Sequence, residues 1–185
     1  MRKKYRFPVF LVLLFFFILT IFIFTIFEPE KVVENIGIGN TYLIIFIVGV
    51  IAGFSFLVSH NFLILYIAFI SAGVNPIILG LLGSIGITIG DFLAYAVGFF
   101  GRNSIEDPRK NKKIKKLSKW IEKQNKYTIF GFIYLYSGFF IFPKDILCGA
   151  LGFVEYPIKK IVIPLFLGNL SYNLGIAFLV IISVL

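Results

Sequence analysis

The chain has 185 residues, of which 59% are hydrophobic and 24 are Phe, and its mean hydropathy is +0.96. This composition excludes a water-soluble globular domain, because one core of that size cannot hide so much apolar surface, and it predicts a single all-α integral membrane domain. The net charge of +9 does not indicate nucleic acid as a partner, because the basic residues flank apolar segments and form no recognised nucleic-acid motif.

The first predicted element is a membrane-spanning helix from Pro8 to Phe27. At 1.5 Å per residue its length is about 30 Å, which matches the hydrocarbon thickness of a bilayer. Basic residues crowd the first six positions, so we expect a cytoplasmic N-terminus. No small-residue cleavage site follows, and the helix is expected to be retained. Residues 1–41 are therefore predicted to be an N-terminal transmembrane helix and an external loop.

Residues 42–101 are predicted to form a re-entrant helical hairpin followed by a crossing helix. The polar residues 59–61 interrupt the apolar stretch, and the next run, 62–72, spans only about 16 Å as a helix. We expect the hairpin to enter from outside and to turn at 59–61, before one crossing at 77–101. Three crossings connect the same end points equally well, although one of them is then very short.

Residues 102–126 are predicted to be a cytoplasmic amphipathic segment, because they hold ten of the 18 Lys and Arg residues. Apolar side chains recur there at helical spacing, with Trp120 as an anchor in the headgroup layer and Lys113 and Lys116 beside anionic lipid. The segment either contacts lipid in this way or serves only as a topology signal that prevents translocation.

Residues 127–185 repeat the first pattern in the opposite direction, so we predict two inverted repeats. A hairpin entering from the cytoplasm breaks at Pro143, and a crossing helix takes the C-terminus outside the cell membrane. The sequence GDFLAYAVG at 90–98 is similar to GNLSYNLG at 168–175, and a proline closes each hairpin. Inverted repeats with broken helices place a substrate or ion site near the midplane, where the breaks meet.

The candidate pathway residues are the charged groups in apolar runs. A charge at the bilayer centre costs about 2.5 to 3.5 kcal/mol, so adjacent Lys144 and Asp145 are expected to line a cavity or to be buried in protein. Asp91 is the expected counter-charge to Lys144, either in transport or proton movement or as a structural ion pair. Tyr95 is assigned to the same pathway, and His60 is assigned to the pathway or to free backbone groups at the hairpin tip.

The run GSIGITIGDFLAYAVGFFGR at 83–102, followed by a basic loop, a proline-centred break and a glycine-bearing last helix, resembles the DedA, or SNARE-associated Golgi protein (VTT-domain), superfamily. The resemblance covers roughly Gly49 to Ala177. Its most specific motif consists of Gly90, Asp91, Tyr95, Gly98, Gly101 and Arg102. It implies two facing re-entrant hairpins and the movement of polyprenyl phosphate carriers or phospholipids between leaflets. Gly168 and the motif glycines are expected to pack helices within or between chains, which allows a homo-oligomer.

Two departures distinguish this chain from the common bacterial pattern. The first hairpin offers only residues 59–61 where that pattern has a glutamate and a Pro-Gly-Glu element, and Lys144 replaces the arginines near Pro143. These departures indicate a divergent, YqaA-like branch, in which the proton coupling of typical members is not implied.

The leading functional hypothesis is a lipid transporter or scramblase in which Lys144 attracts a phosphate headgroup. The alternative is a proton- or cation-coupled transporter of a small solute, with Asp91 and Asp145 changing protonation. An enzyme is not expected, because the sequence presents neither a nucleophile with a base nor metal-ligand spacing, and no cofactor is predicted.

Overall fold

The computed structural model describes residues 33–35, 37–102, 121, 123–139 and 143–184. All regular secondary structure in these ranges is helical, which confirms the all-α prediction. The predicted N-terminal helix lies outside the described residues, as do Lys113, Lys116 and Trp120 of the basic segment.

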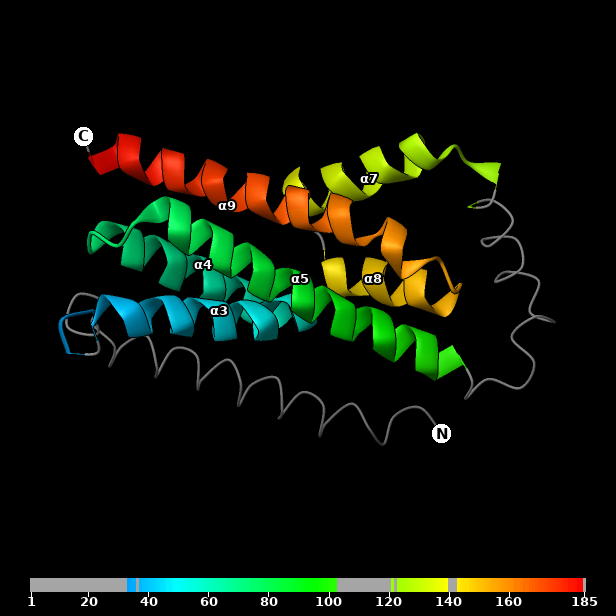
Figure 1. Ribbon diagram of the computed structural model, residues 1–185, viewed down its shortest axis with the longest axis horizontal. Helices are drawn as coiled ribbons and strands as arrows, with labels where there is room; N and C mark the ends of the chain where they lie inside the picture. Colours follow the sequence, from blue (N-terminus) through cyan, green and yellow to red (C-terminus); the bar gives the residue numbers. More distant parts are fainter. Residues whose placement is uncertain (1–32, 36, 103–120, 122, 140–142, 185) are drawn as a thin grey trace, which may run out of the picture.

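The helices form two hairpins and two long helices (Figure 1). Long helices α5 and α9 run along the molecule in opposite directions, with the α3–α4 hairpin at one end and the α7–α8 hairpin at the other. Both hairpins turn near the middle of the longest axis. The elements are α3 (Ile38–Phe54), α4 (Phe56–Ser71), α5 (Pro76–Gly101), α7 (Lys126–Phe139), α8 (Lys144–Phe153), the 3-10 helix η3 (Ile158–Lys160) and α9 (Val162–Val184).

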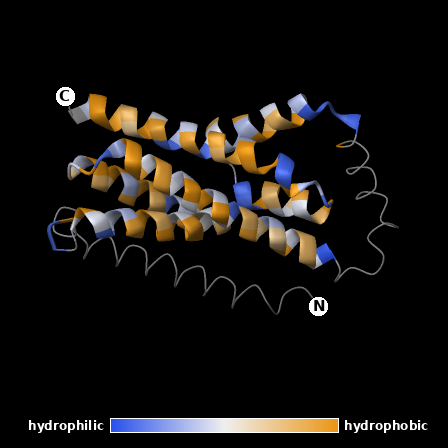
Figure 2. Ribbon diagram, viewed as in Figure 1, coloured by the Kyte–Doolittle hydropathy of each residue, from blue (hydrophilic) through white to orange (hydrophobic). Residues whose placement is uncertain are grey.

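Two helical segments, Pro76–Gly101 and Ile158–Ser183, are long and apolar enough to cross a membrane. Helices α3 and α4 have 17 and 16 residues, so each is only about 25 Å long, which is less than the hydrocarbon thickness. Large apolar side chains are exposed along the helices, and Figure 2 shows hydrophobic colouring over most of their length. Such an exterior suits a lipid environment.

The first hairpin turns at Ser55 and not at the predicted residues 59–61, which lie inside α4. Ser55 has extended backbone angles, and an added Cβ at the neighbouring Gly53 would meet the backbone of Ile87 in α5. The Ser59 hydroxyl donates to the Ala52 carbonyl at 2.8 Å. Ala52 is in the last turn of α3, where backbone carbonyls lack helical partners. The Ser59 side chain, from the first turn of α4, therefore supplies the hydrogen bond that this carbonyl would otherwise lack.

Both hairpins end in the same kind of helix cap. The residue after each cap position has a positive φ, of 85° at Gly73 and 58° at Glu155. Two backbone bonds close each cap in the Schellman pattern, and a proline follows within three residues. The bonds run from Gly73 N–H to the Ile70 carbonyl, Val74 N–H to Phe69, Glu155 N–H to Gly152 and Tyr156 N–H to Leu151.

The interior contains two apolar clusters, one at each end. The first joins α3, α4, α5 and the later part of α9, with Tyr66, Phe69 and Leu79 fully buried. The second joins α5, α7, α8 and the start of α9, with Ile133 and Leu165 fully buried. Both α5 and α9 take part in each cluster, so the residues midway along these helices lie between the two cores.

Candidate functional site

A layer of buried polar side chains occupies this midway position. Its members are at most 5% exposed and come from the two long helices: Ser84, Thr88 and Asp91 of α5, and Asn169 and Asn173 of α9. Within each helix their spacing of three or four residues places them on one face. Polar groups buried among apolar helices are costly unless they are hydrogen-bonded, so the pairing between the two faces determines how the helices fit together.

Asn169 is the junction of this layer. Its Nδ2 donates to Asp91 Oδ2 at 3.0 Å and to Thr88 Oγ1 at 3.1 Å, while its Oδ1 accepts from Lys144 Nζ at 2.8 Å. Asp91 and Lys144, the expected counter-charges, are thus connected through the Asn169 amide, and no direct ion pair joins them in the described residues. An asparagine offers both donors and an acceptor, so one side chain serves a cation and a carboxyl group at once.

Asn173, one turn further along α9, connects a third helix to the layer. Its Nδ2 donates to Ser84 Oγ at 2.9 Å, and its backbone carbonyl accepts from the Tyr66 hydroxyl of α4 at 3.0 Å. The hydroxyls of Ser84 and Thr88 donate in turn to carbonyls one turn earlier in α5, at 2.6 and 2.7 Å. The polar layer is thus continuous from α4 through α5 and α9 to the start of α8.

Three buried acceptor oxygens in the described part of the chain have no hydrogen-bond partner: Oδ1 of Asp91, of Asp145 and of Asn173. Unpaired buried oxygens are unusual in folded proteins, and each of these can accept a hydrogen bond from a proton-bearing group, a water molecule or a ligand donor. Among the described residues, no group of three His, Cys, Asp or Glu side chains is placed to hold a metal ion.

Lys144 lies at the tip of the second hairpin, as the first residue of α8 after Pro143. It is half-buried, and its Nζ is 5.9 Å from the centre of the Tyr172 ring of α9, within the range of a cation–π contact. Asp145 is in the first turn of α8, where a carboxylate complements the helix dipole. No direct ion pair between Lys144 and Asp145 is found in the described residues.

Two predicted pathway residues lie outside the polar layer. The Tyr95 hydroxyl donates to the Tyr156 carbonyl at 2.8 Å, so this side chain fastens α5 to the connection between α8 and α9. His60 lies in α4 with an exposed side chain, and the Ser59 hydroxyl donates to the Ala52 carbonyl at the hairpin tip. The sequence placed both residues in the pathway because polar character in an apolar run was the available signal.

Glycines allow the hairpins to approach the long helices closely. An added Cβ at Gly90 would meet backbone atoms of α3, one at Gly98 would meet the Gly149 backbone of α8, and one at Gly168 would meet α7. Among the described residues, no atom lies within 4 Å of a Cβ added at Gly101, so no described contact accounts for the predicted packing role of this glycine. These close approaches hold α3 and α8 against α5, and α7 against α9.

Residues 7–182 match the family model described as the VTT domain. The chain belongs to the VTT-domain family. This is the DedA, or SNARE-associated Golgi protein, family indicated by the glycine-aspartate-tyrosine motif, and the VTT domain makes the chain a membrane protein of the DedA class. The match extends beyond the stretch from Gly49 to Ala177 that carried the resemblance. No curated protein and no solved structure matches the chain.

Two asparagines of this VTT domain were not among the predicted site residues. Asn169 and Asn173 were noted only for the similarity of GNLSYNLG to GDFLAYAVG, in which Asn169 takes the place of Asp91. The signal that identifies them is their spacing: two amides four residues apart in an apolar span share one face and require partners there. Ser84 and Thr88 carry a weaker signal, because hydroxyls in membrane helices bond to their own backbone.

Proposed function

We propose that this VTT domain is a lipid transporter or scramblase that moves polyprenyl phosphate or phospholipid between leaflets. One observation carries the proposal: Lys144, a half-buried cation at a hairpin tip, meets the polar layer through Asn169 and lies over the Tyr172 ring. A positive charge held at this depth between apolar helices attracts a phosphate headgroup, while acyl chains remain among the exposed apolar side chains.

The proposal includes a membrane arrangement for the two hairpins. Helices α3 and α4 are too short to span, and the hairpins lie at opposite ends of the molecule with their turns near its middle (Figure 1). In this arrangement α5 and α9 cross the bilayer, while the hairpins re-enter from opposite faces as two inverted repeats. The matching caps at Gly73 and Glu155 and the direct contact of Asp91 with Asn169 support the repeat relationship.

A proton- or cation-coupled transporter of a small solute is the second candidate. The unpartnered Oδ1 of Asp91 favours it, because a carboxyl group with a buried, unsatisfied oxygen gains by binding a proton or a cation. Lys144, at the other side of the Asn169 amide, opposes a cation at the same point. The lipid hypothesis is therefore the one that the charges of the polar layer support better.

Reconstitution into liposomes separates the two candidates. The purified full chain is placed in vesicles with a fluorescent anionic lipid in both leaflets, and a membrane-impermeant quencher reports the fraction that reaches the outer leaflet. A lipid scramblase accelerates this exchange without any ion gradient. Exchange at the rate of protein-free vesicles, with and without a proton or sodium gradient, contradicts the lipid hypothesis.

A further inference from the structure

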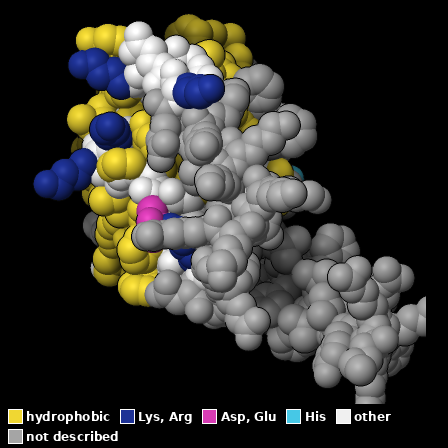
Figure 3. Space-filling view, turned by 90° about the vertical axis from the view of Figure 1, so that its right-hand side faces the viewer, with side chains coloured by type: hydrophobic (Ala, Val, Ile, Leu, Met, Phe, Trp, Pro, Cys, Tyr) yellow, Lys and Arg dark blue, Asp and Glu magenta, His cyan; other side chains and the backbone are white. Residues whose placement is uncertain are grey.

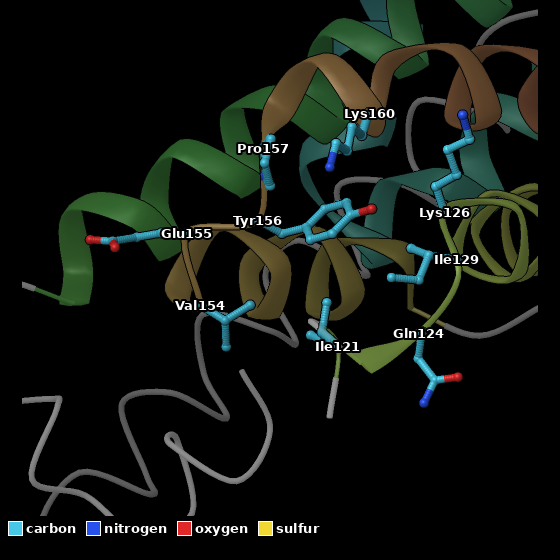
Figure 4. A pocket seen from close by; sticks show the side chains of 9 residues that line it. All are labelled: Ile121, Gln124, Lys126, Ile129, Val154, Glu155, Tyr156, Pro157 and Lys160. Carbon is cyan, nitrogen blue, oxygen red and sulfur yellow. The ribbon is translucent and has the colours of Figure 1, made fainter. Parts of the chain in front are cut away.

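A pocket of about 380 Å³ lies away from the polar layer, at the end of the molecule where α7 begins (Figure 4). The start of α7 forms one side and the connection between α8 and α9 forms the other. Figure 3 shows lysine and arginine side chains and a small acidic patch on this end. The lining residues used below are Lys126, Ile129, Val154, Glu155, Tyr156 and Lys160.

Among the described lining residues, the positive charge of this pocket is not neutralised. Glu155 is the acidic residue in this set, and its carboxylate forms an ion pair with Arg102, the residue that follows α5, at 2.5 Å. Lys126 and Lys160 form no ion pair among the described residues, and their Nζ atoms lie 4.9 and 5.9 Å from the ring centres of neighbouring tyrosines. Two lysines therefore remain available to an anion at the rim.

The wall that carries Lys160 is fixed before any ligand binds. Glu155 closes the cap of α8 with a left-handed backbone conformation, and its ion pair holds it to α5. The Tyr95 hydroxyl holds the next residue by its carbonyl. Pro157 and the 3-10 turn Ile158–Lys160 follow directly, so the position of Lys160 is set by several independent bonds. A preorganised wall lowers the ordering cost of binding.

The remaining lining matches an amphiphile better than a free ion. Ile129, Val154 and the ring of Tyr156 give the pocket apolar surface beside the two lysines. Burial raises the pKa of Tyr156 above its ordinary value of 10, so its hydroxyl stays protonated at neutral pH and can donate to a phosphate oxygen. This combination of two cations, one hydroxyl donor and apolar walls recognises a phosphate that is attached to a glycerol or acyl portion.

We propose that this pocket is a binding site for the phosphate group of an anionic lipid, held by Lys126 and Lys160 with the glycerol portion against Ile129 and Val154. The site goes beyond the proposed transport function and does not involve Lys144. It lies at the end of the molecule where headgroups gather if α5 and α9 span the bilayer, and it gives the domain a fixed contact with lipid at that surface.

The test measures binding of dihexanoyl phosphatidic acid to the full-length protein in neutral detergent and phosphate-free buffer. Lys126→Gln/Lys160→Gln is compared with Lys159→Gln, which removes the same kind of charge from an exposed residue outside the pocket lining. Each pocket lysine is expected to contribute about fivefold in affinity, so the double variant binds about twenty-fivefold more weakly. Lys159→Gln is expected to stay within about twofold.

Two further arms identify the ligand and guard against misfolding. Inorganic phosphate is measured in the same way. If it binds as tightly as the lipid, with the same dependence on the two lysines, the phosphate site is supported and its ligand is free phosphate. If the lipid binds more tightly, the ligand is the phosphate headgroup of a lipid. If the double variant does not elute as folded protein, Lys160→Gln alone is expected to lose about fivefold. Equal affinities of the pocket variants and Lys159→Gln for both probes overturn the proposal, whatever the translocation rate.

Discussion

Replacing Asn169 by leucine tests the organisation of the polar layer. Leucine has the same branched shape as asparagine, so the substitution removes the hydrogen bonds while keeping the shape, and the same substitution at Asn173 controls for the larger methyl groups. Three bonds are lost at once: those to Asp91, to Thr88 and from the Lys144 ammonium group. The perturbation separates the two charged groups that the amide connects and leaves each of them buried without this partner.

The magnitude follows from the three bonds. The bond from Lys144 is charge-assisted and contributes about 1.5 to 3 kcal/mol, while polar bonds between membrane helices contribute roughly 0.6 to 1.7 kcal/mol each. Asn169→Leu is therefore expected to lower the free energy of unfolding by about 3 to 6 kcal/mol. Asn173→Leu is the matched control, because this residue is equally buried on the same helix and its side chain makes one recorded bond, to Ser84.

The assay is reversible unfolding in mixed detergent micelles, followed by circular dichroism, with both variants under the same conditions. The control is expected to lose only about 0.6 to 1.7 kcal/mol. The reasoning is refuted if Asn173→Leu costs as much as Asn169→Leu, or if Asn169→Leu unfolds like the unaltered protein. Either result means that Asn169 does not hold the charges of the layer together.

Three further predictions address packing, capping and lipid contact. Gly90→Ala should lower the unfolding free energy by about 1 to 3 kcal/mol, because the new Cβ meets backbone atoms of α3 that cannot rotate away. The control Gly101→Ala, which meets no described atom, should cost nothing. Equal losses in the two variants would contradict the packing. Glu155→Gly should be about 1 kcal/mol more stable than Glu155→Ala, since both variants lose the ion pair but only glycine relieves the strain of the positive φ. The reverse order of stability would contradict the helix-cap conformation. A peptide of residues 102–126 containing Trp120 should bind anionic vesicles and dissociate at high salt, and absent or salt-insensitive binding would leave this segment as a topology signal only.

The sequence was informative wherever a feature depends on local chemistry. Pro143 predicted the break before α8, because proline cannot continue a helix, and Asn75 with Pro76 marks the start of α5, where the Asn75 side chain accepts from two backbone N–H groups. The composition also predicted the all-α class. These signals need no knowledge of what lies opposite each residue.

Features that depend on a distant partner were harder to predict. The first hairpin turns at Ser55, which has no breaking residue of its own, because Gly53 lets α3 approach α5 and Ser59 satisfies a carbonyl at the turn. Asn169 stands between the counter-charges Asp91 and Lys144, and its position there follows only when α5, α8 and α9 are placed together. Polarity in an apolar run indicates that a partner exists but does not identify it.

Lipid translocation by Lys144 variants is the most direct test of the proposed function. Lys144→Ala, Lys144→Arg and the exposed control Lys123→Ala are reconstituted at equal density, after each is shown to be folded by its unfolding curve in detergent. We predict that translocation of a fluorescent anionic lipid falls to the background rate in Lys144→Ala, is partly retained in Lys144→Arg because the positive charge remains, and is unchanged in Lys123→Ala. Translocation at the unaltered rate by folded Lys144→Ala would contradict the account.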